Sequence, residues 1–213
     1  MPLDERRAQL LELGMALFAE RPYEEVAVDD IANAAGVSKG LLYHYFGGKR
    51  DFYLACVRQT ADTLLAAVDP RGEPPGPQRI VKALRAYFDF VGERPRAYLA
   101  LLSGGMGVDE SVVGVVNTTR DAIVGQILDA IGLEEPRPVF RLAARTWVGA
   151  VETSCQDWIA HRDVDRETLV DLLVTCLVVS LHKATQLDPE SGVIIPDAIL
   201  SAVLPRAARG QSS

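Results

Sequence analysis

Residues 28–49 constrain the fold of this chain most strongly, because two short helical patterns there flank a tight turn at Gly36-Val37-Ser38. In the first pattern Ile31, Ala34 and Ala35 recur at spacings i, i+3 and i+4, which gives one apolar stripe along a helix. Small alanines at positions 32, 34 and 35 let a second helix approach closely. The stretch therefore predicts two short helices that cross at a steep angle.

The turn and the second helix can be predicted from single residues. Gly36 stands where a helix ends with a positive φ, which glycine adopts without steric cost. Ser38 can accept a backbone N–H of the next turn, so it caps the following helix. The core contacts of that helix fall to Leu42, Tyr45 and Phe46. Its outer face consists of Lys39, Gly40, Leu41, Tyr43 and His44, with Lys49 just beyond its end.

This outer face has the charge and the side chains of a surface that reads DNA in a helix-turn-helix. Residues 36–50 contain Lys39, Lys49 and Arg50 and no acidic residue, although the chain carries a formal net charge of −7. Exposed aromatic side chains beside these lysines are hard to explain by packing alone. Many all-α proteins with an alanine-rich helix pair never touch DNA, and spacing by itself leaves that alternative open.

The run A-A-G-V-S-K-G-L-L-Y-H-Y-F-x-x-K, residues 34–49, resembles the N-terminal signature of the TetR family of one-component transcriptional regulators. The resemblance covers roughly the first quarter of the chain. It includes the positions Leu10, Ala16, Phe18, Tyr23, Ile31, Ala32, Phe52 and Tyr53. The other three quarters are similar to the family only in length and helical pattern.

The resemblance implies that the outer face binds operator DNA. Lys39 and Gly40 would meet a backbone phosphate and a neighbouring base edge, and Lys49 would hold a second phosphate. Leu41 could touch only a thymine methyl group. The implied DNA-binding residues are Ser38, Lys39, Gly40, Leu41, Tyr43, His44 and Lys49.

Two residues depart from the family pattern at the preceding helix. Ala27 stands where a threonine often caps that helix and contacts a phosphate, and alanine can do neither. Asp29 stands where the family frequently has a basic residue, so one backbone contact becomes doubtful or repulsive. Asp29 and Asp30 do suit the positive end of the helix. Because residues 1–50 hold six Lys/Arg against eight Asp/Glu, we expect modest non-specific DNA affinity.

The whole chain is predicted to be all-α. We expect an N-terminal three-helix DNA-binding domain with a helix-turn-helix at residues 1–48, a helical ligand-binding and dimerisation domain at 49–205, and a disordered tail at 206–213. Outside the helix-turn-helix, helices are expected at about residues 4–20, 49–68, 78–92, 96–103, 109–131 and 138–161. Asp165 caps a last long helix that ends near Gln186, and the proline-rich segment 69–77 is an exposed loop.

The last two long helices predict a subunit interface. Residues 169–182 are apolar nearly all round, and a helix apolar on every side is buried on every side. An intrachain core is the alternative, but the resemblance implies a homodimer joined by a four-helix bundle. Such a dimer would place two recognition helices about 34 Å apart, matching two half-sites. The interface residues expected are Val148, Val151, Cys155, Leu169, Leu172, Leu173 and Cys176.

A ligand pocket among the middle helices is a further expectation. Its lining would be Phe88, Tyr98, Leu102, Met106, Thr118, Phe140 and Trp147. A mostly apolar cavity with few polar groups is the usual design of a small-molecule site, although the same side chains also suit an ordinary core. Candidate polar anchors are Asn117, Arg120, Gln126 and Glu152, each of which also suits a solvated helix face.

Several classes of protein are disfavoured by the sequence. His44, His161 and His182 lie far apart without metal-ligand spacing, and no catalytic or phosphate-binding motif appears. We therefore expect no enzyme, no metal and no cofactor. The three cysteines suit buried positions in a reducing cytosol. The N-terminus lacks a signal-peptide pattern, and the longest apolar run is too short for a bilayer, which predicts a cytoplasmic protein without a membrane partner.

The sequence thus predicts a dimeric DNA-binding transcriptional regulator. The preferred mechanism is a repressor released from a pseudo-palindromic operator when a largely apolar small molecule binds. Two alternatives remain at this point. One is a transcriptional activator, and the other is a helical ligand sensor or adaptor of the same fold that does not bind an operator.

Overall fold

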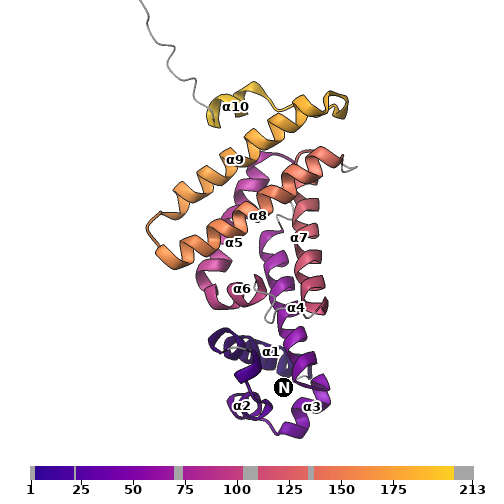
Figure 1. Ribbon diagram of the computed structural model, residues 1–213, viewed down its shortest axis with the longest axis vertical. Coiled ribbons are helices and arrows are strands. Elements are labelled where there is room, and N and C mark those ends of the chain that lie inside the picture. The colour runs from indigo at the N-terminus through magenta and orange to yellow at the C-terminus, as the bar shows by residue number, and fades with distance from the viewer. Residues whose placement is uncertain (1–2, 22, 70–73, 103–109, 134–136, 204–213) are drawn as a thin grey trace, which may run out of the picture. The chain divides into compact units, whose positions relative to one another are not determined.

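The computed structural model describes residues 3–21, 23–69, 74–102, 110–133 and 137–203, and these residues form helices without a strand among them. The predicted all-α class is confirmed (Figure 1). The α-helices are α1 Leu3–Glu20, α2 Val28–Ala34, α3 Lys39–Phe46, α4 Lys49–Val68, α5 Pro77–Glu93, α6 Pro95–Leu102, α7 Glu110–Ala130, α8 Pro138–His161, α9 Arg166–Leu187 and α10 Asp197–Val203. Two short 3₁₀ turns, η1 Tyr23–Glu25 and η2 Pro189–Ser191, complete the list.

The predicted helix ends agree with the structure to within about one residue, except that α10 was not predicted. Seven residues are too few for a helix to be stable alone in water, so its formation depends on tertiary contact. The structure supplies that contact, because α10 packs against α9 (Figure 1).

The chain divides into two compact units. Unit 1 comprises residues 1–68 and 89–119, and unit 2 comprises residues 69–88 and 120–213. Unit 1 thus continues through α4, past the boundary that the sequence predicts at residue 48. The predicted domain limits stay predictions, and the tail at 206–213 lies outside the described residues.

The core of unit 1 holds the helix-turn-helix against α1 and α4. Phe46 meets Phe52 edge to face with ring centroids 4.8 Å apart, and Phe18 meets Tyr53 at the same distance. Such geometry is favourable for aromatic rings beyond their burial. At Gly14 the two long helices cross closely, because a Cβ placed there would lie 2.2 Å from a ring carbon of Phe52. Phe52 itself is fully buried.

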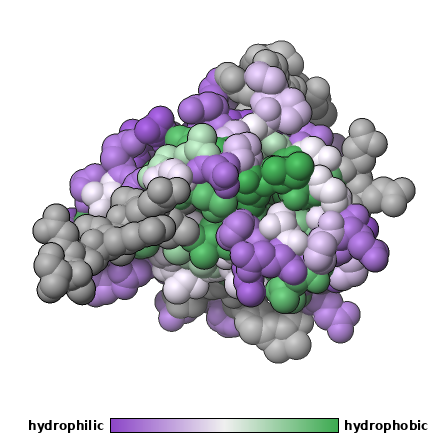
Figure 2. Space-filling model, turned by 90° about the horizontal axis from the view of Figure 1, so that it is seen from above, coloured by the Kyte–Doolittle hydropathy of each residue, from purple (hydrophilic) through white to green (hydrophobic). Residues whose placement is uncertain are grey.

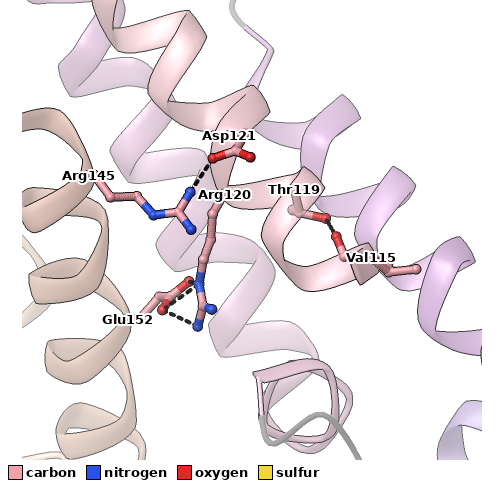
Figure 3. Close-up of polar contacts among 6 residues, drawn as sticks. All are labelled: Val115, Thr119, Arg120, Asp121, Arg145 and Glu152. Carbon is pink, nitrogen blue, oxygen red and sulfur yellow. Dashed lines mark hydrogen bonds and ion pairs between the residues drawn. The ribbon is translucent and has the colours of Figure 1, made fainter. Parts of the chain in front are cut away.

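Unit 2 is built around α8 and α9, which lie side by side in Figure 1. Their contact buries apolar side chains and includes a polar bond: the indole Nε1 of Trp147 donates to the carbonyl oxygen of Leu173 at 2.7 Å. Ion pairs fasten α7 to α8 (Figure 3), where Arg120 binds both carboxylate oxygens of Glu152 and Arg145 binds Asp121. Two of the predicted polar anchors, Arg120 and Glu152, are therefore paired with each other.

Two features differ from the sequence expectation. Cys56 and Cys155 are buried as predicted, and burial raises the pKa of the Cys56 thiol, but Cys176 is exposed. In addition, α9 is long and apolar enough to cross a membrane by length and composition alone. A core helix of a soluble protein passes the same test, and α9 packs against both α8 and α10, so this one helix does not indicate a membrane protein.

Candidate nucleic-acid interface

The N-terminus of α2 is stabilised by Asp30 rather than by the side chain of the N-cap residue. Ala27 is the N-cap and its side chain makes no cap hydrogen bond, as expected for alanine. The backbone N–H of Ala27 instead donates to Oδ2 of Asp30 at 3.1 Å, and Arg21 pairs with the same carboxylate at 3.1 Å. Asp30, the third residue of α2, thus stabilises the start of the helix, although the alanine at position 27 offers no capping side chain.

The stripe of α2 that faces the core is shifted from the predicted one. Ile31, Ala32 and Ala35 are buried, whereas Ala34 is exposed. The spacing i, i+1 and i+4 also falls on one side of a helix, so the pattern of alanines alone could not choose between the two stripes. The alanines on the buried side of α2 are therefore Ala32 and Ala35, and α2 contacts α3.

The turn between α2 and α3 has the geometry predicted for it. Gly36 has φ +61°, and the backbone N–H groups of Gly36 and Val37 donate to the carbonyls of Asn33 and Ala32 at 3.2 and 3.0 Å. These two bonds form a Schellman motif, which satisfies the last carbonyls of α2. Ser38 then caps α3, because its hydroxyl accepts the backbone N–H of Leu41 at 3.1 Å.

The outer face of α3 is open to solvent. Leu42 and Phe46 are buried, while Leu41 and Tyr43 keep 38% and 46% of their surface exposed. Two large side chains with apolar surface thus project into solvent from an eight-residue helix. The structure brings the other predicted residues to this face as well, with Ser38, Lys39, Gly40 and His44 all exposed.

Lys49 is only half-exposed and is held in place. Its ammonium lies 4.2 Å above the ring of Tyr23, and it donates to the carbonyl oxygen of Glu24 at 3.4 Å. The side chain of Arg50, the next residue, donates to the hydroxyl of Ser111 at 3.0 Å. Both cations at the start of α4 are thus oriented by unit 1 itself.

Lys39 is paired with the acidic residue that departs from the family pattern. Its Nζ lies 2.8 Å from Oδ1 and 2.9 Å from Oδ2 of Asp29. The hydrogen bond to Asp29 raises the pKa of Lys39 above its ordinary value, so this lysine stays charged. Sequence reasoning noticed Asp29 but missed its partner. A pair of opposite charges ten residues apart across a tight turn was the signal.

Comparison with known proteins gives this geometry its context. Residues 10–56 match the family described as bacterial regulatory proteins, tetR family, and residues 77–180 match the tetracyclin repressor-like C-terminal domain. The chain is 31% identical over 178 residues to the HTH-type transcriptional activator FasR of Mycolicibacterium smegmatis, a match covering 80% of each chain. The chain belongs to the TetR family.

Two further TetR-family comparisons agree. A solved TetR-family regulator from Streptomyces coelicolor has 32% identity and a TM-score of 0.79, covering 96% of this chain and 90% of that one. The HTH-type transcriptional repressor KstR2 of Mycobacterium tuberculosis is 42% identical over 64 residues, 30% of this chain and 32% of that protein. The chain is therefore a helix-turn-helix, DNA-binding transcriptional regulator, as predicted.

The residues predicted for a TetR-type dimer interface divide into two sets. Five are buried inside the chain: Val148, Val151, Cys155, Leu169 and Leu173. Leu172 and Cys176 are exposed on α9 and so are available to a second chain. The helices α8 and α9 therefore contribute side chains both to the core of the chain and to an exposed apolar face.

The residues predicted to line a ligand pocket are mostly in the core. Phe88, Tyr98, Phe140 and Trp147 are buried, Leu102 is half-buried, Thr118 is exposed and Met106 lies outside the described residues. The six of these residues that the structure describes line neither of two cavities that the described residues form. Their role in binding stays a prediction.

The two cavities differ in chemistry. One in unit 1, about 570 Å³, is bounded by α1, α4, α6 and the end of α5 and has charged residues such as Glu12, Arg94 and Arg96 in its wall. The other, in unit 2, is about 320 Å³ and is lined only by aliphatic side chains, prolines and glycines. Val174, Val178, Leu181, Ile194 and Ile199 belong to this aliphatic cavity.

Proposed function

We propose that this regulator is a homodimeric, cytoplasmic repressor that leaves a pseudo-palindromic operator when a largely apolar small molecule binds. The observation that carries the proposal is the outer face of α3, where Leu41 and Tyr43 stand exposed between two lysines. KstR2, a relative over part of the chain, is described as a repressor.

The proposed DNA contacts follow from what each side chain offers. Tyr43 and His44 would bond to phosphates and base edges, and Leu41 would meet a thymine methyl group. Lys49 is already oriented by Tyr23 and Glu24, so little side-chain entropy is lost when it meets a phosphate. Ser38, Lys39 and Gly40 complete the contact surface at the start of α3.

This surface can be tested with single alanine variants. We expect Tyr43→Ala and Lys49→Ala to weaken operator binding at least tenfold, as loss of a good contact does, without changing the oligomeric state. Lys82→Ala removes one exposed lysine from unit 2, on α5, and serves as the matched control. Fluorescence anisotropy with the upstream intergenic duplex and sedimentation give the two readouts. Wild-type affinity in both variants would refute the assigned surface.

Salt dependence separates a DNA-binding regulator from a helical sensor that has lost its operator. Each phosphate contact releases condensed counterions, so the logarithm of affinity falls linearly with the logarithm of salt concentration, by about 0.9 per contact. We expect a slope that corresponds to several contacts. An affinity for duplex DNA that does not change with salt would favour the sensor.

The proposed dimer uses the exposed face of α8 and α9 rather than the residues buried between them. Leu142 on α8 and Leu172 and Val179 on α9 are exposed, together with Cys176, and Gly149 on α8 lets a second helix approach. Leu172 is 56% exposed, which is costly for an apolar side chain of that size in a monomer.

Leu172→Glu should convert the dimer into monomers, because two-fold symmetry buries the new charge twice. Val113→Glu places the same charge on another exposed apolar position, on α7, and should leave the dimer intact. Sedimentation velocity distinguishes the two results. A Leu172→Glu variant that still sediments as a dimer would exclude this face.

The aliphatic cavity of unit 2 is the proposed ligand site. Its volume of about 320 Å³ lies at the lower end of the range for small-molecule sites, and its lining offers no aromatic ring and no polar side chain. Seen from above in Figure 2, apolar side chains gather on the face of the molecule that carries α9 and α10. Such a lining suits an aliphatic chain.

Dodecanoic acid is a suitable probe for this site. Calorimetric titration should show binding to the wild-type protein and its loss in Val178→Trp, which fills the cavity, whereas Val113→Trp should bind as the wild type does. If the ligand also releases DNA, the coupling is reciprocal, and operator DNA must weaken the probe by the same factor. Equal probe affinity with and without operator would refute the release mechanism.

A second candidate function is transcriptional activation, because FasR, which matches over 80% of this chain, is described as an activator. A reporter gene behind the upstream intergenic region decides between the two. Deleting the regulator raises reporter expression if it represses and lowers it if it activates.

A further inference from the structure

The pair between Asp29 and Lys39 joins the two helices of the DNA-reading motif. Lys39 is the first residue of α3, and Asp29 lies in the first turn of α2. Both carboxylate oxygens lie within 2.9 Å of the ammonium, and both side chains are at least half-exposed, at 64% and 50%. The pair is therefore part of the surface that is proposed to meet DNA.

The second acid of the same turn has a different task. Asp30 accepts the backbone N–H of Ala27 and pairs with Arg21, so it stabilises the start of α2. Among the described residues, Asp29 bonds only to Lys39. The hydrogen bond that stabilises the start of α2 thus comes from Asp30 and not from Asp29. The contact of Asp29 is with the recognition helix α3, through Lys39.

We propose that Asp29 is a specificity-determining residue, which occupies Lys39 in the free protein and so withholds this lysine from sequence-independent DNA binding. The proposal rests on the assignment of Lys39 to the DNA surface. It concerns how tightly the regulator holds the wrong sequences, a property separate from which operator it prefers.

The physical argument begins with non-specific binding. That binding is almost entirely electrostatic and scales with the number of phosphates that Lys and Arg neutralise. A lysine paired with a carboxylate presents no net charge, so it releases few counterions. A phosphate that approached Lys39 would also lie close to Asp29, and two anions sharing one cation repel each other.

At an operator the balance differs. Contacts from Leu41, Tyr43 and His44 to matching bases would hold α3 in the groove, and their free energy offsets the cost of separating Lys39 from Asp29. A cost equal on every sequence would leave the ratio of affinities unchanged, so the difference must come from where Asp29 lies in each complex. At an operator the base contacts would fix α3 in one position, in which Lys39 reaches a phosphate and Asp29 is held away from it. On other sequences α3 is not fixed, Lys39 stays with Asp29, and the carboxylate repels the nearby phosphates. Asp29 therefore lowers non-specific affinity more than operator affinity, and widens the ratio between them.

The first test measures Asp29→Asn on two duplexes, one of random sequence and one that the wild-type protein selects from a randomised pool. On the random duplex we expect affinity to rise several-fold and the salt slope to steepen by up to about 0.9, equivalent to one more phosphate contact. On the selected duplex the rise should be smaller, so the specificity ratio falls. Glu25→Gln, which removes one exposed acid from unit 1, controls for net charge.

A double-mutant cycle then asks whether Asp29 acts through Lys39. In a Lys39→Gln background, Asp29→Asn should gain about two- to fivefold less non-specific affinity than in the wild type, the range expected for an exposed ion pair. Equal gains in both backgrounds would mean general repulsion of DNA and would overturn the proposal. So would a gain no larger than that of Glu25→Gln, or an unchanged specificity ratio.

The cycle also separates this proposal from the proposed contact surface. If Lys39→Gln changes binding to neither duplex, Lys39 is not a DNA contact, and both proposals fail at that residue. If Lys39→Gln weakens binding while Asp29→Asn behaves like Glu25→Gln, the contact stands and the role of Asp29 alone is refuted.

Discussion

Unit 1 and unit 2 are both helical, but they are held together in different ways. In unit 1 the α2–α3 pair depends on a few individual features: the positive φ of Gly36, the hydroxyl of Ser38 and the carboxylate of Asp30. In unit 2 the α8–α9 pair depends on the summed burial of aliphatic side chains, with one indole bond between them. A single polar or backbone change should therefore matter more in unit 1, and a change of buried volume more in unit 2.

The largest expected effect comes from the same substitution made in both units. Gly14→Ala forces a methyl group into the ring of buried Phe52, whereas Gly125→Ala on α7 places one where nothing lies within 4 Å. Both gain helix propensity, so their difference isolates the clash, about 1–3 kcal/mol of unfolding free energy. Urea unfolding measures it. Equal stability of the two variants would show that the α1–α4 crossing relaxes freely.

Trp147→Phe tests whether unit 2 is as independent of single polar groups as its packing indicates. The variant keeps an aromatic ring between α8 and α9 but loses the bond to the Leu173 carbonyl. We expect a loss of about 1 kcal/mol for the bond, and somewhat more for the smaller ring. Folding and dimerisation should survive, as circular dichroism and sedimentation would show. Failure of the variant to fold would show that unit 2, like unit 1, depends on a single polar group.

The smallest effects come from the two helix caps, one in each unit. Ser38→Ala should cost about 1 kcal/mol at every pH, because a hydroxyl does not titrate. Asp165 caps α9 by accepting the backbone N–H of Thr168 at 3.0 Å, and bonds to Thr168 hold the pKa of Asp165 below its ordinary value.

The pH dependence of the second cap follows from that direction. A carboxyl whose pKa is lower in the folded state stabilises the fold above its unfolded pKa, about 3.9, and loses this contribution as pH falls through the folded value. Asp165→Asn should therefore be less stable than the wild type at neutral pH and equal to it in strong acid. Unfolding curves between pH 2 and 7 check this. A difference that persists at pH 2 would mean that the charge is not involved.

Local rules explain why the helix-turn-helix could be predicted in detail. The residues that decide it, Gly36 and Ser38, act on backbone groups at most five positions away, so their effect is visible in the sequence. The bounds of α4 and α8 were predicted for a similar reason, from residues at or beside their ends. The pairing of Lys39 with Asp29 needed the relative placement of two helices, which spacing along the chain does not supply.

The apolar helices show the opposite case. On α9, Leu172 and Leu173 are adjacent in the sequence, yet one is exposed and the other buried. A helix that is apolar nearly all round gives no periodic signal for which side meets the chain's own core. For that reason five of the predicted interface residues lie inside the chain, and the aliphatic cavity involves residues 193–199, which the sequence did not single out.

The crossing at Gly14 has a mechanical consequence. Because no side chain at Gly14 separates α1 from the ring of Phe52, we expect a movement of α4 to carry α1 with it. The guanidinium of Arg6, on α1, in turn grips the carbonyl of Ala35 at the end of α2, at 3.2 Å. A displacement of α4 would thus be transmitted through α1 to α2 and α3. We expect α3 to move with these helices as one rigid body, without a change in its own conformation.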